Sequence, residues 1–305
     1  MNKDSKQIFQ RQNQVGLVDA QKTAACCYAY GKKLIIVLAL LLILYPIVVN
    51  ILVFFIDNMV LSGILTSLLF VSLVIAEVLR KQISKAKFNG TGMQQYFDEV
   101  VFDLKNSCKK YLAPKKLTLS ERLKLISKYK DRSNENYKNW YSDFSSLPYE
   151  QAVYQCQKQN IRWDLSVRKK YLILLMVSAS FLALVVILNV IIQRYEVLSL
   201  ITILSSIFPF FSYFFNSFKK LNSDISAQED LYKHIEKIEE QITKENEIWN
   251  EVEELQVEIF SYRKKAYLIP NWFHCILKKD LQESENEFAK LFCEENNKNN
   301  EKAGD

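Results

Sequence analysis

The chain has few of the residues that break helices and few of those that commonly carry catalysis. Its 305 residues include six glycines, five prolines and two histidines. Gly90 and Gly92 are the only glycines close together, which is too few for a loop that cradles phosphate groups. His234 and His274 form no motif with each other or with a cysteine, and no CxxC pair, nucleophile elbow or paired-carboxylate motif occurs. We therefore expect no enzyme activity, no metal and no cofactor.

What the chain does have is four apolar runs without a charged residue. They cover residues 34–56, 58–76, 171–193 and 197–218. At about 1.5 Å per residue, each run is long enough to cross a hydrocarbon core about 30 Å thick. Only Asp57 separates the first two runs, and only residues 194–196 separate the last two. The sequence predicts an all-α integral membrane protein with two transmembrane helical hairpins, four spans in all, and a helical cytosolic domain.

The residues beside these runs are basic. Lys32 and Lys33 precede the first run, Lys219 and Lys220 follow the fourth, and further basic residues flank the other two. Basic flanks stay in the cytosol, so we expect a multi-pass protein with both termini and the segment between the hairpins on that side. The net charge is +6 and the outer connections, with Asp57, Arg194 and Glu196, carry −1, so the cytosolic parts carry about +7 next to the bilayer. This charge either contacts anionic lipid or binds a phosphate-bearing ligand.

The composition divides the chain into six segments. These are a cytosolic N-terminal arm (1–33), a first hairpin (34–79), a cytosolic helical segment (80–170), a second hairpin (171–218), a cytosolic long helix with a terminal helix (219–293) and a disordered tail (294–305). Pro148 is expected to start a helix that meets no glycine or proline before Pro209 and therefore runs unbroken into the third span. The stretch Asn89-Gly90-Thr91-Gly92 is expected to form a loop.

A long amphipathic helix is predicted after the fourth span. Apolar residues three and four positions apart recur between residues 222 and 265 and define one face of a helix. This face packs either within the protomer or in a short coiled coil between protomers. Pro270 ends the helix, and Asn271-Trp272-Phe273 opens a short last one.

The most distinctive cytosolic block precedes the third span and mixes aromatic, acidic and basic side chains. Its candidate ligand-binding residues are Trp140, Tyr141, Asp143, Arg162, Trp163 and Arg168. Aromatic rings stack on bases, and guanidinium groups pair with phosphates. In the alternative interpretation, the rings anchor the helix at the membrane interface and the arginines pair with acidic residues inside the protein.

The fourth run carries a stripe of small polar residues at helical spacing. The candidate pore-lining residues are Ser199, Thr202, Ser206, Ser212 and Asn216. Such a stripe either lines a water-filled path between assembled protomers or lets helices pack closely in lipid. No span carries an interior charge, which argues against an ion-coupled transporter.

The cytosolic block also carries a family resemblance. Asn139-Trp140-Tyr141-Ser142-Asp143, Leu147-Pro148, Cys156-Gln157, Asn160, Arg162-Trp163-Asp164 and Arg168-Lys169-Lys170-Tyr171 together resemble the central signature of the SMODS-associating four-transmembrane effectors. Arg11-Gln12-Asn13, Tyr262-Arg263 and Pro270-Asn271-Trp272-Phe273 fit the same family. The resemblance extends from about residue 8 to residue 293 and includes no catalytic motif.

The resemblance implies an effector of a bacterial anti-phage system of the CBASS type. A partner nucleotidyltransferase makes a cyclic oligonucleotide, and the effector then forms pores in the bacterial inner membrane, which causes abortive infection. The implied partners are this second messenger, the nucleotidyltransferase, membrane lipid and further copies of the chain, without direct nucleic-acid binding. Two alternatives remain open: a membrane receptor or scaffold that recruits a soluble partner through its cytosolic helices, and a constitutive channel or transporter.

Overall fold

The computed structural model describes residues 4–45, 48–49, 52, 58–104, 116–133, 135–193, 197–242 and 249–304. Every regular element in these ranges is helical. The elements are α1 (Lys6–Arg11), α2 (Val15–Ala39), the π-helical turn η1 (Leu40–Leu44), α4 (Met59–Val101), α5 (Leu119–Lys128), the 3-10 turn η2 (Glu135–Tyr137), α6 (Tyr149–Gln193), α7 (Val197–Ile242), α8 (Trp249–Lys265) and α9 (Asn271–Gly304).

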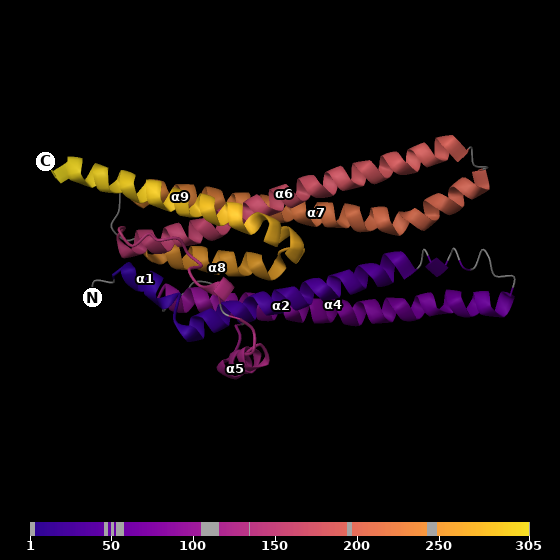
Figure 1. Ribbon diagram of the computed structural model, residues 1–305, viewed down its shortest axis with the longest axis horizontal. Helices are drawn as coiled ribbons and strands as arrows, with labels where there is room; N and C mark the ends of the chain where they lie inside the picture. The colour runs from indigo at the N-terminus through magenta and orange to yellow at the C-terminus, as the bar shows by residue number, and fades with distance from the viewer. Residues whose placement is uncertain are drawn as a thin grey trace.

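Two pairs of long helices define the shape of the molecule (Figure 1). α2 packs along α4, and α6 packs along α7. Both pairs extend in the same direction beyond a body of shorter and terminal helices, and the two chain ends lie at the far side of that body. Among the described residues, two helical stretches are long and apolar enough to cross a membrane, Val15–Leu44 and Tyr149–Leu188.

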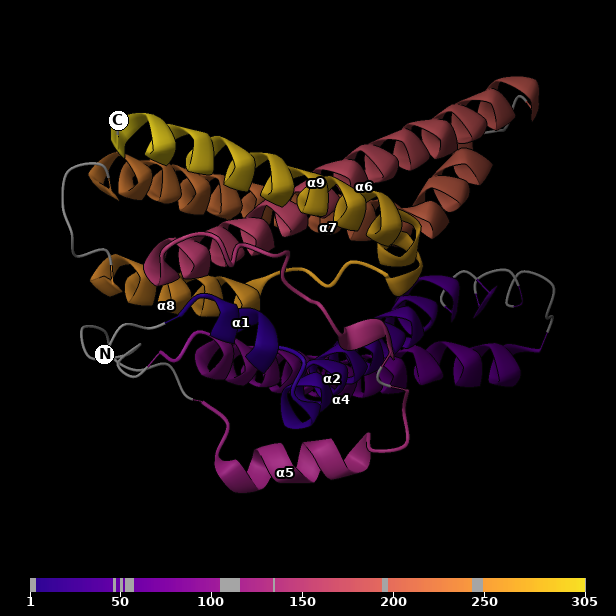
Figure 2. The same cartoon turned by 60° about the vertical axis from the view of Figure 1, so that its left-hand side comes forward.

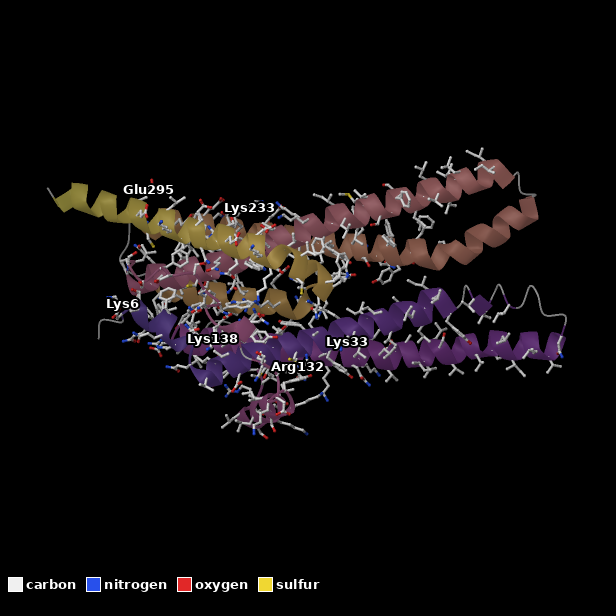
Figure 3. All side chains as sticks on the ribbon, viewed as in Figure 1. Lys6, Lys33, Arg132, Lys138, Lys233 and Glu295 are labelled. Carbon is white, nitrogen blue, oxygen red and sulfur yellow. The ribbon has the colours of Figure 1, made fainter. Side chains whose placement is uncertain are left out.

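The outer halves of the pairs differ in chemistry from the body. Figure 3 shows side chains rich in nitrogen and oxygen over the body, whereas the outer halves carry mainly carbon. Large apolar side chains there face outward, among them Val74 of α4 and Phe181 of α6, which are 67 % and 68 % exposed. Soluble proteins do not leave such extended apolar surfaces in water, so the outer halves are suited to lipid.

Helix α6 connects the two regions without a break. It begins directly after Pro148, as the sequence predicts, and runs for 45 residues. Its first turns are buried in the body, where Ala152, Val153 and Cys156 are 0 % exposed, and its outer half carries the apolar surface. One rigid rod therefore joins the body to the apolar half of the second pair.

The predicted loop at Asn89-Gly90-Thr91-Gly92 is wrong, because α4 remains helical through these residues. The glycines permit close helix packing instead of a turn. A Cβ atom on Gly90 would lie 3.0 Å from the ring of Tyr28 on α2. The Tyr28 hydroxyl and the Thr91 hydroxyl are hydrogen-bonded at 3.0 Å, which holds the ring in place. Tertiary contact with α2 thus outweighs the cost of about 1 kcal/mol for a glycine inside a helix.

Filling the space at Gly90 should loosen this contact. We expect Gly90→Val to lower the free energy of unfolding by about 1–3 kcal/mol, because the added methyl groups overpack against Tyr28. Gly63 lies on the same helix with no neighbouring atom within 4 Å of a Cβ position, so Gly63→Val is the matched control. Thermal unfolding in detergent measures both. Equal melting temperatures would contradict the close approach of α2 to α4.

The long helix predicted over residues 222–265 is two helices. α7 ends at Ile242, and α8 begins at Trp249 and folds back beside it. Ile235 of α7 and Leu255 of α8 lie in the same buried core, so the apolar face packs within the protomer. A continuous helix over this range would be about 66 Å long and would carry much of its apolar face away from the body. Two shorter helices bury both parts of that face.

Helix α9 is longer than the sequence predicts. A short helix followed by a disordered tail over residues 294–305 is expected, whereas α9 continues to Gly304. Ala289 and Phe292 pack against the core and hold the helix upstream. Extending an existing helix is far easier than starting one, and the Lys and Glu residues that follow are good helix formers.

Helix α8 lies between the two pairs (Figure 2). It contacts α4 on one side and α6 and α7 on the other. The side chain of Gln256 shows this bridging role, because its Nε2 donates to Gln95 on α4 at 2.9 Å and its Oε1 accepts from Gln157 on α6 at 3.1 Å. In the body, α8 therefore connects the two pairs.

Candidate functional site

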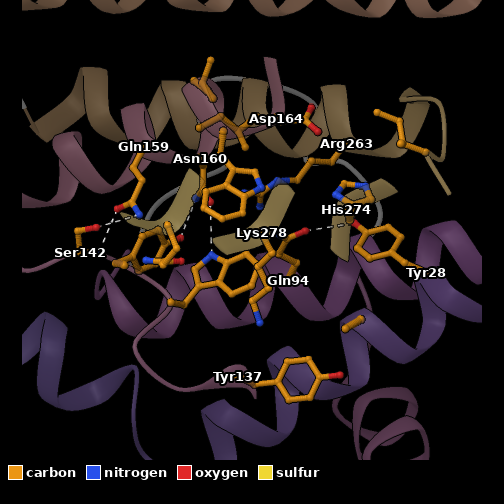
Figure 4. Close-up of a pocket in the computed structure, with 18 of the residues that line it drawn as sticks. Tyr28, Gln94, Tyr137, Ser142, Gln159, Asn160, Asp164, Arg263, His274 and Lys278 are labelled. Carbon is orange, nitrogen blue, oxygen red and sulfur yellow. Dashed lines mark hydrogen bonds between the residues drawn. The ribbon is translucent and has the colours of Figure 1, made fainter. Parts of the chain in front are cut away.

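A cavity of about 860 Å³ lies where the two helix pairs enter the body. α2 contributes Tyr28 and Lys32 to its wall, α6 contributes Trp163 and Arg168, and further residues come from α8, α9 and the segment 136–143. Figure 4 shows these elements around the space. Cavities between about 300 and 1,000 Å³ are typical of small-molecule sites.

Five of the six candidate ligand-binding residues line this cavity. They are Trp140, Tyr141, Asp143, Trp163 and Arg168. Arg162 does not, because it points toward α9. Its Nη2 lies 2.5 Å from Oε2 of Glu285, and its guanidinium lies 3.8 Å from the ring centre of Phe288. Consecutive residues of a helix point about 100° apart, which separates Arg162 from its neighbour Trp163.

Arg168 lines the cavity, but its charge is already used inside the protein. Its Nε donates to Asp164 at 2.7 Å, and its Nη1 donates to Asp224 at 3.1 Å and to the carbonyl of Tyr267 at 3.2 Å. Although burial acts in the opposite direction, the Arg168 guanidinium holds the pKa of Asp164 below its usual range. Internal pairing, one of the two interpretations of this block, therefore describes Arg168.

Tyr141 belongs to a second buried network, built on Asp98 of α4. The Asp98 carboxylate is 0 % exposed and accepts hydrogen bonds from Tyr141 at 2.6 Å, Arg263 at 2.6 Å and Gln256 at 3.1 Å. The Asn160 amide donates to the Tyr141 hydroxyl at 2.8 Å. Burial raises the pKa of Tyr141 well above its ordinary value, so this hydroxyl stays neutral and donates to Asp98.

The segment that carries Trp140 and Tyr141 is held against the N-terminal arm. Gln12 pairs with the backbone of Tyr141 through two hydrogen bonds, at 2.8 Å and 3.2 Å. Asn13 accepts from the backbone N–H of Asn139 at 2.9 Å and donates to the Asn139 side-chain oxygen at 2.8 Å. The φ of Asn139, 49°, lies in the left-handed region that asparagine tolerates. The distant stretches that carry the family resemblance thus meet around one cavity.

Most of the cavity residues were not among the candidates, and three of them, Lys32, His274 and Lys278, are basic side chains on α2 and α9. Lys32 served only to predict membrane orientation, His274 has no motif partner, and Lys278 lies in an ordinary charged helix. Nothing in the local sequence singles them out. Their common position depends on α9 folding back toward α2, where the Nζ of Lys32 donates to Asn271 at 2.8 Å.

The candidate pore-lining residues lie on α7, away from this cavity. Ser212 is half-buried, and Asn216, one turn further, is exposed and donates a hydrogen bond of 3.5 Å to it. The side chains of Ser199, Thr202 and Ser206 lie outside the described part of the structure. In the described ranges, no group of three or more His, Cys, Asp or Glu side chains is placed to hold a metal ion.

The apolar outer halves and the cavity at their base define a helical membrane protein with a ligand-sized site in its polar body. A family model described as the SMODS-associating 4TM effector domain matches residues 6–291, and the chain belongs to this family. The family name places the protein among membrane effectors associated with CBASS nucleotidyltransferase systems. No curated protein and no solved structure matches the chain.

Proposed function

We propose that this protein is a pore-forming effector of the bacterial inner membrane, activated when a cyclic oligonucleotide from a partner nucleotidyltransferase binds the cavity. In this proposal, four spans cross the membrane and both termini lie in the cytosol. One observation carries it: α2 and α6 both line the cavity, and both continue into apolar stretches that can cross a membrane. A ligand in the cavity therefore contacts both membrane hairpins at once.

The cavity offers the groups that a nucleotide ligand needs. Trp140 and Trp163 are half-buried on its wall and supply ring surface for stacking on bases. Gln94 and Asn160 supply amide donors and acceptors for base edges. The volume suits a ligand larger than a mononucleotide. Tyr141, Asp143 and Arg168 are the other candidate ligand residues on the wall.

The proposed activation shifts the assembly from a closed to a conducting arrangement. Since α6 is unbroken, a tilt or rotation at Trp163 reaches the outer half of the same helix. A ligand drives such a change only through its different affinity for the two states, and a shift from 1:99 to 99:1 requires about 10⁴-fold. The polar face of α7, with Ser199, Thr202, Ser206, Ser212 and Asn216, then lines the path in a homo-oligomer. Loss of membrane integrity causes abortive infection.

A receptor or scaffold is the second candidate, and helix α5 favours it. α5 stands away from the body in Figure 2. Leu119 and Leu123, one turn apart on it, are 64 % and 58 % exposed. A soluble partner could dock on this apolar surface without any pore.

Release of dye and ions from liposomes that contain the purified protein separates these functions. With a panel of cyclic di- and trinucleotides, we expect release with one or a few members only. Trp140→Ala and Trp163→Ala should each raise the half-maximal concentration about tenfold or more, since stacking on one base contributes about 1–3 kcal/mol. Trp272→Ala is the matched control, because Trp272 is 54 % exposed and lies outside the cavity wall.

The other outcomes reject the proposal. Release without any nucleotide would indicate a constitutive channel. No release with any member of the panel, from folded and inserted protein, would favour the scaffold. An equal effect of all three tryptophan replacements would show that the nucleotide does not act by binding in the cavity.

A further inference from the structure

The cationic side chains on the cavity wall fall into two groups, and the arginines form the first. Arg168 is paired with Asp164 and Asp224, and Arg263 is paired with Asp98. The Arg263 contact is 2.6 Å, and its carboxylate partner is fully buried. These ion pairs stabilise the body. Because carboxylates already neutralise both arginines, the two guanidinium groups attract an anionic ligand only weakly.

The wall also carries Lys32, Lys138 and Lys278. Lys32 and Lys278, each hydrogen-bonded to a neutral oxygen, form the second group. The Nζ of Lys32 donates to Asn271 at 2.8 Å, and the Nζ of Lys278 donates to the carbonyl of Asn136 at 3.3 Å. Within the described residues, neither ammonium group has a carboxylate at ion-pair distance. Both partners are neutral oxygens, so among the described residues neither lysine is neutralised by a direct ion pair.

His274 joins these lysines. It lies one helical turn before Lys278 on α9, and Figure 4 shows both on the cavity wall. Burial and the Lys32 charge lower the pKa of His274 to about 4. Burial and the Arg168 charge lower the pKa of Lys32 to about 8, although Asp164 acts in the opposite direction. The Lys32 charge thus opposes protonation of His274, which is neutral at pH 7 and offers a ring N–H as a hydrogen-bond donor.

We propose that Lys32, His274 and Lys278 form an anion subsite that binds a phosphate group of the cavity ligand. The identity of that ligand as a cyclic oligonucleotide rests on the proposed function, whereas the phosphate chemistry rests on the three side chains. The assignment moves the phosphate contact from Arg162 and Arg168 to residues of α2 and α9. A phosphate held there ties the first membrane hairpin to α9.

The subsite makes ligand binding depend on pH. The titratable groups that face Lys32 are Asp164 and Arg168 from α6 and His274 and Cys275 from α9. A bound phosphate favours the charged form of Lys32 and so raises its pKa. Below pH about 8 the free protein already carries this proton. At higher pH the complex must take up a proton, so affinity falls as pH rises through about 8.

The first test uses inorganic pyrophosphate as the probe and the melting temperature of the full-length protein in uncharged detergent as the readout. Pyrophosphate should raise the melting temperature of the wild type, more at pH 7 than at pH 9. Lys32→Met should lose this response, and Lys32→Arg should keep it at both pH values. Lys33→Met is the matched control, because Lys33 is the exposed next residue. An equal response of Lys32→Met and the wild type, or none in folded wild type, would overturn the subsite.

A second test separates the subsite from the proposed function. In the liposome assay, Lys32→Met should raise the half-maximal concentration of an active cyclic nucleotide about tenfold or more. If the panel releases dye equally well from the wild type and from Lys32→Met, the proposed effector function is supported and the proposed anion subsite is wrong. If pyrophosphate raises the melting temperature only when Lys32 is present but no cyclic nucleotide causes release, the anion subsite is supported and the proposed effector function is wrong. A Lys32-dependent shift with short-chain phosphatidylglycerol, but with no cyclic nucleotide, would assign the phosphate to lipid and overturn the nucleotide contact.

Discussion

Asp98→Asn is expected to lower the free energy of unfolding by about 3–5 kcal/mol. The Asp98 carboxylate is fully buried and accepts from Arg263, Tyr141 and Gln256. An amide in its place has no charge and turns its own donor toward one of these donors. Arg263 then becomes a buried charge without a counter-charge, which is the expensive state. Thermal or chemical unfolding of the purified protein in detergent measures the loss.

A double-mutant cycle tests whether the pair itself is responsible. Arg263→Gln alone should cost a similar amount, but the double variant should lose clearly less than the sum, since no unpaired charge remains. Glu77→Gln is the matched control on the same helix. Glu77 and Arg80 are 57 % and 54 % exposed, and such pairs contribute little. Fully additive losses in the double variant would contradict a direct interaction of Asp98 with Arg263.

Arg168→Met is expected to cost about 3–5 kcal/mol for the complementary reason. The guanidinium of Arg168 joins Asp164 of α6 to Asp224 of α7 and bonds the carbonyl of Tyr267. Methionine keeps the apolar packing of the stem but removes the Arg168 charge from Asp164 and leaves Asp224 with Lys220 as its ion-pair partner. The second helix pair should therefore loosen where it enters the membrane. The melting temperature at pH 7 measures this effect.

The contribution of Asp164 to the free energy of unfolding should change with pH in opposite directions in Arg168→Met and in the wild type. In the wild type, the pKa of Asp164 is held below its usual range by Arg168, so the pair stabilises the fold above the unfolded pKa and loses this contribution in acid. Without Arg168, burial raises the pKa of Asp164 above its unfolded value, so protonation favours the folded state. The deficit of Arg168→Met should shrink as pH falls from 7 toward 5.

Lys169→Met is the matched control for this measurement. Lys169 and Glu229 form an ion pair in which both side chains are about half exposed, so water screens their charges. Its loss should leave both the melting temperature and the pH profile unchanged. A constant deficit of Arg168→Met across this pH range would show that packing, rather than charge pairing, is the main contribution of Arg168.

The elements that could be predicted from the sequence depend on residues close together in the chain. Pro148 precedes α6 and Pro270 precedes α9, because proline lacks the donor that an upstream helix would need. The apolar runs indicate a membrane because length and lack of charge are properties of contiguous residues. The loop assigned to Gly90 and Gly92 failed, since these glycines serve a contact with Tyr28 and Leu117 on other elements.

In the candidate site, too, some features could be predicted from neighbouring residues in the sequence and others depend on tertiary contacts. The sequence located the block around Trp140 and Trp163 because aromatic and charged side chains concentrate there. It could not tell Arg162 from Arg168, since both are arginines on one helix near the membrane. Their partners, Glu285 and Asp224, lie 123 and 56 positions away in the chain. Only the fold shows that one leaves the cavity and the other is neutralised within it.

The sequence by itself determined that this protein is helical, lies in a membrane and belongs to its effector family. Each of these conclusions rests on composition, periodicity or motifs along the chain. The tertiary structure decided which charges are compensated and which face a cavity. That decision depends on α8 bridging the two helix pairs and on α9 returning to α2, where Asn271 meets Lys32 across 239 positions. Compensation of a charge is a property of neighbours in space, because the free energy of a buried ion depends on the groups that surround it.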